Sequence, residues 1–133
     1  SGFGGDTDQY FAVEFANTLN PLKLSFYRGE NSGGRKGAYG SVPVARETRV
    51  HVALSFDGSK IRGFLEGQLQ FEVSDTQGWV NTGAPLRVGQ NIVLDYSQYR
   101  ASFQGCMAGV RLTVGNHRYT SNFAVPQFPL HSQ

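Results

Sequence analysis

Apolar side chains in this chain recur at every second position rather than at the spacing of a helix. Val50, Val52, Leu54 and Phe56 alternate with smaller or more polar neighbours. A repeat of two residues is typical of a β-strand with one buried face, because successive side chains of a strand point to opposite sides. The Asp-Gly dipeptide at 57–58 then favours a tight hairpin turn into a returning strand at residues 61–65. The pattern therefore predicts antiparallel β-sheet.

The same alternation predicts further short strands along the chain. Asn20 and Pro21 mark a turn, and the strands on either side of it are expected to form a hairpin. Residues 29–40 hold five glycines and are expected to be a polar loop, because glycine disfavours a helix. Many short strands separated by turns are typical of an all-β fold, a two-sheet antiparallel β-sandwich without significant helix. Glu66 and Gly67 are expected to form a second turn into a strand at residues 69–73. The additional strands are predicted at residues 10–15, 22–27, 86–88, 92–94 and 109–114.

Length and charge limit the domain organisation and the classes of partner. A chain of 133 residues suits a single domain. Its net charge of +2 produces no strong field that would demand nucleic acid or an anionic membrane. The low charge means that we expect no nucleic-acid binding. No apolar run is long enough to span a bilayer, so we expect no membrane insertion either. The lone Cys106 excludes an internal disulfide, and its place in an apolar alternation predicts a small buried thiol.

Residue patterns that would indicate catalysis are missing from the sequence. A glycoside hydrolase needs two carboxylates facing each other across the sugar, often from one strand in a pattern such as E-x-D-x-x-E. The chain has no E-x-D or E-x-E, and the odd spacing of Glu72 and Asp75 would put them on opposite faces of a strand. His51, His117 and His131 lack zinc-site spacing, and His51 is expected to face solvent. The sequence therefore predicts a protein that is not an enzyme.

The closing segment carries the most specific resemblance to a known family. Residues 103–126 read Phe-Gln-Gly-Cys-Met-Ala-Gly-Val-Arg-Leu-Thr-Val-Gly-Asn-His-Arg-Tyr-Thr-Ser-Asn-Phe-Ala-Val-Pro. This segment resembles the end of the laminin G-like (concanavalin A-like) jelly-roll domains found in bacteriophage tail and virion proteins, which read roughly F-x-G-x-I-D-D-x-R-I-T-x-G-x-x-R-Y-T-x-N-F-x-x-P. The matching positions are Phe103, Gly105, Arg111, Thr113, Gly115, Arg118, Tyr119, Thr120, Asn122, Phe123 and Pro126.

The middle of the chain supports the same resemblance, with several departures. Residues 49–58 look like the family's W-H-H-V-A-V-T-Y-D-G, although Arg49 stands in place of the usual Trp. Glu66 replaces an Asp, and Ala108 and Gly109 replace an acidic pair. The family's opening strands are missing, so the chain is either a shortened domain or, as we favour, a fragment of a longer protein. We expect residues 1–9 to be a lead-in that includes a tag remnant, and residues 10–130 to form the domain.

The resemblance implies a lectin-like role, and exposed aromatic side chains are the residues best suited to it. Sugar rings present apolar C–H faces that stack on aromatic rings, while amide and guanidinium groups hydrogen-bond the hydroxyls. Because they lie in stretches that read as loops, we expect ligand contacts from Trp79, Asn81, Tyr96, Tyr99, Tyr39 and Arg28. We also expect Tyr119, Phe123 and Phe128 to be buried and to hold the C-terminal segment on a sheet.

These features lead to two alternative functions. The first is a non-catalytic carbohydrate-binding and adhesion module of a phage tail or virion protein, located on the virion, forming homo-oligomers and contacting cell-surface glycans. The second is a structural decoration or assembly domain that packs against other virion protein chains and binds no sugar. No cofactor is expected. Some domains of this family bind calcium, and Asp57, Asp75 and Asp95 leave that alternative open.

Overall fold

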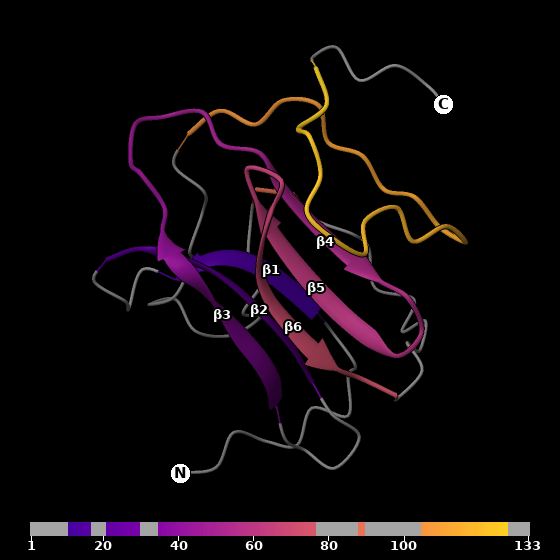
Figure 1. Ribbon diagram of the computed structural model, residues 1–133. Coiled ribbons are helices and arrows are strands. Elements are labelled where there is room, and N and C mark those ends of the chain that lie inside the picture. Colours follow the sequence, from indigo (N-terminus) through magenta and orange to yellow (C-terminus); the bar gives the residue numbers. More distant parts are fainter. Residues whose placement is uncertain (1–10, 17–20, 30–34, 77–87, 90–104, 128–133) are drawn as a thin grey trace, which may run out of the picture.

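The computed structural model describes residues 11–16, 21–29, 35–76, 88–89 and 105–127, and these contain strands and irregular segments but no helix. Two antiparallel sheets of three strands each face one another (Figure 1). This arrangement confirms the predicted all-β, two-sheet sandwich. The first sheet has the order β1 (Phe11–Ala16), β2 (Lys23–Gly29), β3 (Arg35–Pro43), and the second has the order β4 (Val52–Phe56), β5 (Lys60–Leu65), β6 (Gln68–Ser74).

Short turns fix the register of the second sheet. The turn between β5 and β6 consists of Glu66 and Gly67, whose φ angles of 50° and 73° are both positive, as a two-residue type I′ hairpin requires. The turn between β4 and β5 contains Gly58 with a φ of 92°. Both hairpins were predicted from the sequence, as was the hairpin of β1 with β2.

The hydrophobic core lies between the two sheets. Its aromatic contact is made by Phe26 of β2 and Phe71 of β6, with ring centroids 6.4 Å apart. Phe71 occupies the space over Gly63, where a Cβ would lie 2.1 Å from the Phe71 ring, so a larger residue at this position would displace the ring. The buried members of the core cluster are Leu24, Phe26, Val44, Ile61, Leu65 and Phe71.

A buried ion pair also joins the sheets. Arg28 of β2 pairs through Nη2 with Oδ1 of Asp75, which directly follows β6. Their side chains are 4% and 0% exposed, so both charges lie inside the sandwich. Breaking such a pair by removing one partner typically costs about 3–5 kcal/mol, because the remaining charge stays buried. Arg28 and Asp75 therefore act as a cross-sheet connection.

Four sequence-based expectations about local structure require correction. Residues 35–40, expected to be loop, belong to β3, because an edge strand tolerates glycine and Gly37 lets the Phe26 carbonyl approach closely. Residues 109–114, expected to be a strand, are irregular and exposed, as is Cys106, so its thiol is not buried. Val88 lies in a bend rather than a strand.

The C-terminal segment supplies a further layer. Lys60, Arg62 and Phe64 of β5 point away from the core side chains of the same strand, yet Phe64 is 0% exposed. Residues 118–127 cover it, and this segment runs beside the second sheet in Figure 1. The predicted docking of Tyr119 and Phe123 is confirmed, although both are half-buried rather than fully buried. Phe128 lies outside the described residues.

Candidate functional site

Only two of the six predicted ligand contacts fall within the described residues, and they do not lie together. Tyr39 on β3 is 62% exposed. Its register partner is Ser25, whereas Phe26 and Arg28 belong to the alternate, core-facing positions of β2. Tyr39 and Arg28 therefore point to opposite faces of the first sheet, and a ligand could reach the Arg28 guanidinium only if its ion pair opened. The other predicted contacts, Trp79, Asn81, Tyr96 and Tyr99, lie outside the described residues.

A row of neutral hydrogen-bonding side chains starts two residues after Tyr39. The Oε1 atom of Gln70 accepts hydrogen bonds from Ser41 Oγ and from the Val42 backbone N–H, both at 3.2 Å. Gln70 is directed towards β3 by a β-bulge, since Gly63 pairs with Phe71 while Phe64 already pairs with Leu69. Gly40, the residue after Tyr39, also lies beside Gln70, because a Cβ placed on Gly40 would be 3.5 Å from the Gln70 side chain.

The row continues across β6 to the C-terminal segment. Gln70 Nε2 donates to the Gln68 carbonyl at 3.2 Å, and Asn122 Nδ2 donates to Gln68 Oε1 at 3.0 Å. Asn122 Oδ1 in turn accepts the Leu69 N–H at 2.8 Å. We call Ser41, Gln68, Gln70 and Asn122 the amide row. Sequence reasoning missed it, because nothing in the sequence links positions 41, 70 and 122.

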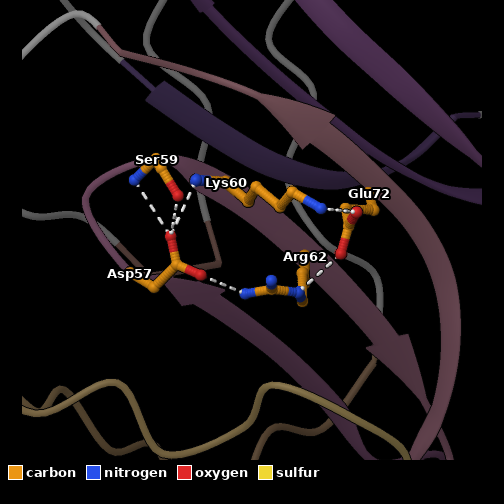
Figure 2. Close-up of polar contacts among 5 residues, drawn as sticks. All are labelled: Asp57, Ser59, Lys60, Arg62 and Glu72. Carbon is orange, nitrogen blue, oxygen red and sulfur yellow. Dashed lines mark hydrogen bonds and ion pairs between the residues drawn. The ribbon is translucent and has the colours of Figure 1, made fainter.

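Charged side chains form a second polar cluster on the outer face of the second sheet (Figure 2). Asp57 Oδ1 accepts hydrogen bonds from the backbone N–H groups of Ser59 and Lys60 at 2.9 and 2.8 Å, which closes the turn. Asp57 Oδ2 lies 2.6 Å from Arg62 Nη1, and Arg62 Nε donates to Glu72 Oε2 at 2.8 Å. Lys60 Nζ binds the other oxygen of Glu72 at 2.5 Å. Two carboxylates and two cations are thus paired with one another.

These contacts keep both carboxylates ionised. The hydrogen bond from Arg62, followed by those from Ser59 and Lys60, holds the pKa of Asp57 far below its ordinary value. Hydrogen bonds from Lys60 and then Arg62 also lower the pKa of Glu72. A catalytic general acid requires the opposite shift, a raised pKa that keeps its proton available at neutral pH. The cluster therefore has the electrostatics of a turn-stabilising network.

His51, just before β4, lies at the junction with the C-terminal segment. Its ring meets that of Phe123 edge-on with centroids 5.7 Å apart, and its backbone N–H donates to a carboxylate oxygen of Glu66. Burial lowers the pKa of His51, and the Glu66 charge partly opposes this shift. The expectation that His51 faces solvent holds only in part, because Phe123 packs on its ring and leaves the residue half-buried.

No metal centre is formed by the residues that the structure describes. Within them, no group of three or more His, Cys, Asp or Glu side chains gathers at one point. Asp57 and Asp75, two of the aspartates considered for calcium, are engaged with Arg62 and Arg28. Asp95 lies outside the described residues. In the same ranges there is also no helix long and apolar enough to cross a membrane.

Comparison with known proteins identifies one family. A model of the concanavalin A-like lectin/glucanases superfamily matches residues 2–114 of the 133-residue chain. Searches of the curated proteins and of the solved structures find no significant match. The family match extends over both sheets and into the exposed segment that begins at Gly105.

Proposed function

The chain belongs to the concanavalin A-like lectin/glucanase superfamily, and we propose that it is a non-catalytic carbohydrate-binding module that attaches to cell-surface glycans. The observation that carries this proposal is the family match over residues 2–114. The fold is a two-sheet sandwich with an exposed tyrosine on an edge strand, and exposed aromatic rings are the usual stacking platforms for sugars. The site of binding is proposed to include Tyr39 together with Trp79, Asn81, Tyr96 and Tyr99.

The contacts of four described carboxylates support a binding role over hydrolysis. Asp57 and Glu72 are ion-paired with lowered pKa values, and Asp75 is buried against Arg28. Glu66 is bound to the His51 backbone N–H. Glycoside hydrolysis needs one carboxyl held protonated opposite a second carboxylate. We propose that the chain lacks this activity, and the release of reducing ends from any bound polysaccharide would contradict the proposal.

The biological context is a further part of the proposal. The closing segment 103–126 resembles the endings of domains from bacteriophage tail and virion proteins. We propose that the module is exposed on a virion, where many copies act together. A single module makes few contacts, so its affinity for a glycan is expected to be weak, about 0.1–1 mM. Many linked copies multiply the avidity without new contacts.

The experiment is a glycan array probed with the protein in monovalent and multivalent form. We expect weak or no signal from the monovalent form and clear binding to bacterial polysaccharides from the multivalent one. Trp79→Ala should abolish binding with little change in melting temperature. Tyr39→Ala should weaken binding, whereas the matched Tyr39→Phe, which keeps the ring, should retain it. If the multivalent protein binds no bacterial polysaccharide, the proposal fails.

A structural decoration or assembly domain is the second candidate, and a specific observation favours it. Met107, Val110, Leu112 and Val114 are exposed along one segment. Exposed apolar side chains gathered in one segment often mark contacts between protein chains. An assembly domain would bind sibling chains at this segment and give no signal on the glycan array.

A further inference from the structure

The amide row is bordered by exposed apolar side chains. Val42 of β3 and Leu69 of β6 are 44% and 38% exposed, and Tyr39 of β3 is 62% exposed. The Val42 N–H donates to Gln70 Oε1. In the same way the Leu69 N–H donates to Asn122 Oδ1, so both apolar residues adjoin the row directly. A surface that offers hydrogen-bonding groups next to apolar ones matches a sugar, whose hydroxyls and C–H faces lie side by side.

The side chains of the amide row hold one another in place. Gln70 and Asn122 each accept a backbone N–H through the side-chain oxygen and donate to Gln68 through the side-chain nitrogen. Ser41 is fixed to the same network by its bond to Gln70. Three parts of the chain that are distant in sequence, namely β3, β6 and the C-terminal segment, therefore present their polar groups together. Side chains that are ordered before a ligand arrives lose less entropy when it binds, which favours affinity.

The row also retains hydrogen-bond donors for a ligand. Each side-chain amide nitrogen carries two N–H groups. In the part of the chain that the structure describes, Gln68 Nε2 donates no bond, while Gln70 and Asn122 use one N–H each. Ser41 Oγ donates its hydrogen to Gln70 and keeps lone pairs that can accept. All four side chains are uncharged, and their described bonds lead to one another and to backbone groups, so the row suits hydroxyls rather than anionic groups.

We propose that the amide row, with Tyr39, Val42 and Leu69 beside it, is the surface on which this module binds an uncharged polysaccharide. The inference rests on the proposed carbohydrate-binding function and adds to it a site and a class of glycan. Sugar hydroxyls accept hydrogen bonds from the amide N–H groups and donate to Ser41, while the C–H faces lie on the exposed apolar side chains. Because the row crosses three segments of the chain, it suits several consecutive sugars rather than one terminal residue.

The substitution Gln68→Glu separates a binding role of the row from a structural one. Glutamate has the shape of glutamine and keeps an oxygen that accepts from Asn122, but it has no N–H to offer and it adds a negative charge. Binding of the multivalent protein to uncharged polysaccharides should fall at least about tenfold, while the melting temperature stays within about two degrees of the parent. Gln127→Glu makes the same change on an exposed glutamine outside the row, and this matched control should bind as the parent does. Ser41→Ala, which removes one hydroxyl, should weaken binding about threefold.

The charge of the ligand is tested on the same array. The probes are uncharged polysaccharides, among them dextran and mannan, and acidic ones, among them dextran sulfate, each at roughly 50 and 500 mM NaCl. We expect binding to uncharged polysaccharides only, with the same strength at both salt concentrations, because salt screens interactions between charges.

The outcomes separate this inference from the function on which it rests. If the parent binds polysaccharides and Gln68→Glu binds them equally well, or if Gln127→Glu loses as much binding as Gln68→Glu, the amide row is not the site and the inference fails while the proposed function stands. Binding confined to acidic polysaccharides would overturn the inference in the same way. A parent that binds no polysaccharide at all would overturn the proposed function, and the inference with it.

Discussion

The C-terminal stretch consists of two parts that differ sharply in how they relate to the sheets. Residues 105–117, the exposed part, carry several large apolar side chains and lie at the surface. Residues 118–127, the docked part, cover Phe64 of β5. In Figure 1 both parts are drawn in orange to yellow, and only the later one runs close beside the second sheet. Apolar composition alone therefore does not decide which part packs.

Aromatic contacts and hydrogen bonds to the second sheet hold the docked part in place. Tyr119 and Phe123 stack with centroids 3.7 Å apart, and the Phe123 ring meets Phe64 at 5.3 Å. The Phe123 N–H donates to the Gly67 carbonyl at 3.0 Å. Asn122 binds β6 through its side-chain amide. The comparison teaches that matched hydrogen bonds and the room left by a glycine position this segment, while aromatic burial stabilises it.

Removing the docked part should have the largest effect. Deleting residues 118–133 exposes Phe64, which is 0% exposed in the intact protein, and removes the rings packed on it. Fully burying one such side chain contributes roughly 1.5–3 kcal/mol, against a typical domain stability of about 5–15 kcal/mol. We expect an unfolded or insoluble product by circular dichroism and sedimentation. A truncated protein that melts within a few degrees of the parent would show that the docked part is dispensable.

Gly67→Ala should disrupt the junction next most strongly. A Cβ at this position would lie 2.0 Å from the Phe123 carbonyl oxygen, and the φ of 73° is unfavourable for alanine. We expect a loss of roughly 2–4 kcal/mol in urea unfolding, from backbone strain and displacement of the docked part. Gly58→Ala is the control, since its φ of 92° gives similar strain but nothing lies within 4 Å of its Cβ. Equal losses in both variants would mean that the Phe123 contact is unimportant.

Asn122→Ala should have an intermediate effect. It removes the bonds to the Leu69 N–H and to Gln68 Oε1. Because a typical hydrogen bond contributes about 0.5–1.5 kcal/mol net and this site is exposed, we expect a loss of about 1 kcal/mol. Asn116→Ala, in the exposed part, should cost less. Thermal melts of the two variants compare the parts directly, and the reverse order would contradict the assignment of Asn122 as an anchor.

Acid should loosen the same junction through His51. Burial lowers its folded-state pKa below the ordinary 6.5, so the unfolded chain binds the proton more tightly than the folded one. Stability is therefore fully present above the unfolded pKa and falls as pH drops through 6.5 towards the lowered folded pKa. Urea unfolding at several pH values in this window should show the decline, and His51→Gln should reduce its slope. The same slope in parent and variant would assign the effect to another group.

Met107→Ser should have the smallest effect. Met107 lies in the exposed part and is 48% exposed, so about half of it is already in water. A surface substitution of this kind usually changes stability by less than about 0.5 kcal/mol. A larger fall in melting temperature would show that the exposed part contributes to packing after all.

The strand pattern of the second sheet could be predicted because its information is local. The alternation from Val50 to Phe56, the Asp57–Gly58 turn and the Glu66–Gly67 turn specify two hairpins with little help from the rest of the chain. The wrong expectation of a loop at residues 35–40 also came from using local information alone. Glycines lowered the strand propensity there, but pairing with β2 and close approach to its backbone carbonyls favoured β3.

The candidate site was less predictable, because its members come together from distant parts of the chain. Tyr39 was found from its side-chain type and proved exposed, whereas Arg28 was chosen on the same grounds and proved buried. The difference is the presence of Asp75, which lies 47 residues away and meets Arg28 across the two sheets. The amide row likewise joins Ser41 to Asn122 through β6, a relation that no local pattern contains.

The sequence by itself determined the all-β class, the hairpins of the second sheet and the family, because period-two alternation, turn dipeptides and the closing motif are all short-range signals. The tertiary structure alone decided which side chains are available to a partner. Phe64 lies on the outward face of β5 and is nevertheless buried, while Val110 and Leu112 have strand periodicity and are exposed. Exposure depends on what packs against a residue from elsewhere in the chain. Phe64 is buried because the Phe123 ring packs on it, and the hydrogen bond from the Phe123 N–H to the Gly67 carbonyl holds that ring in place.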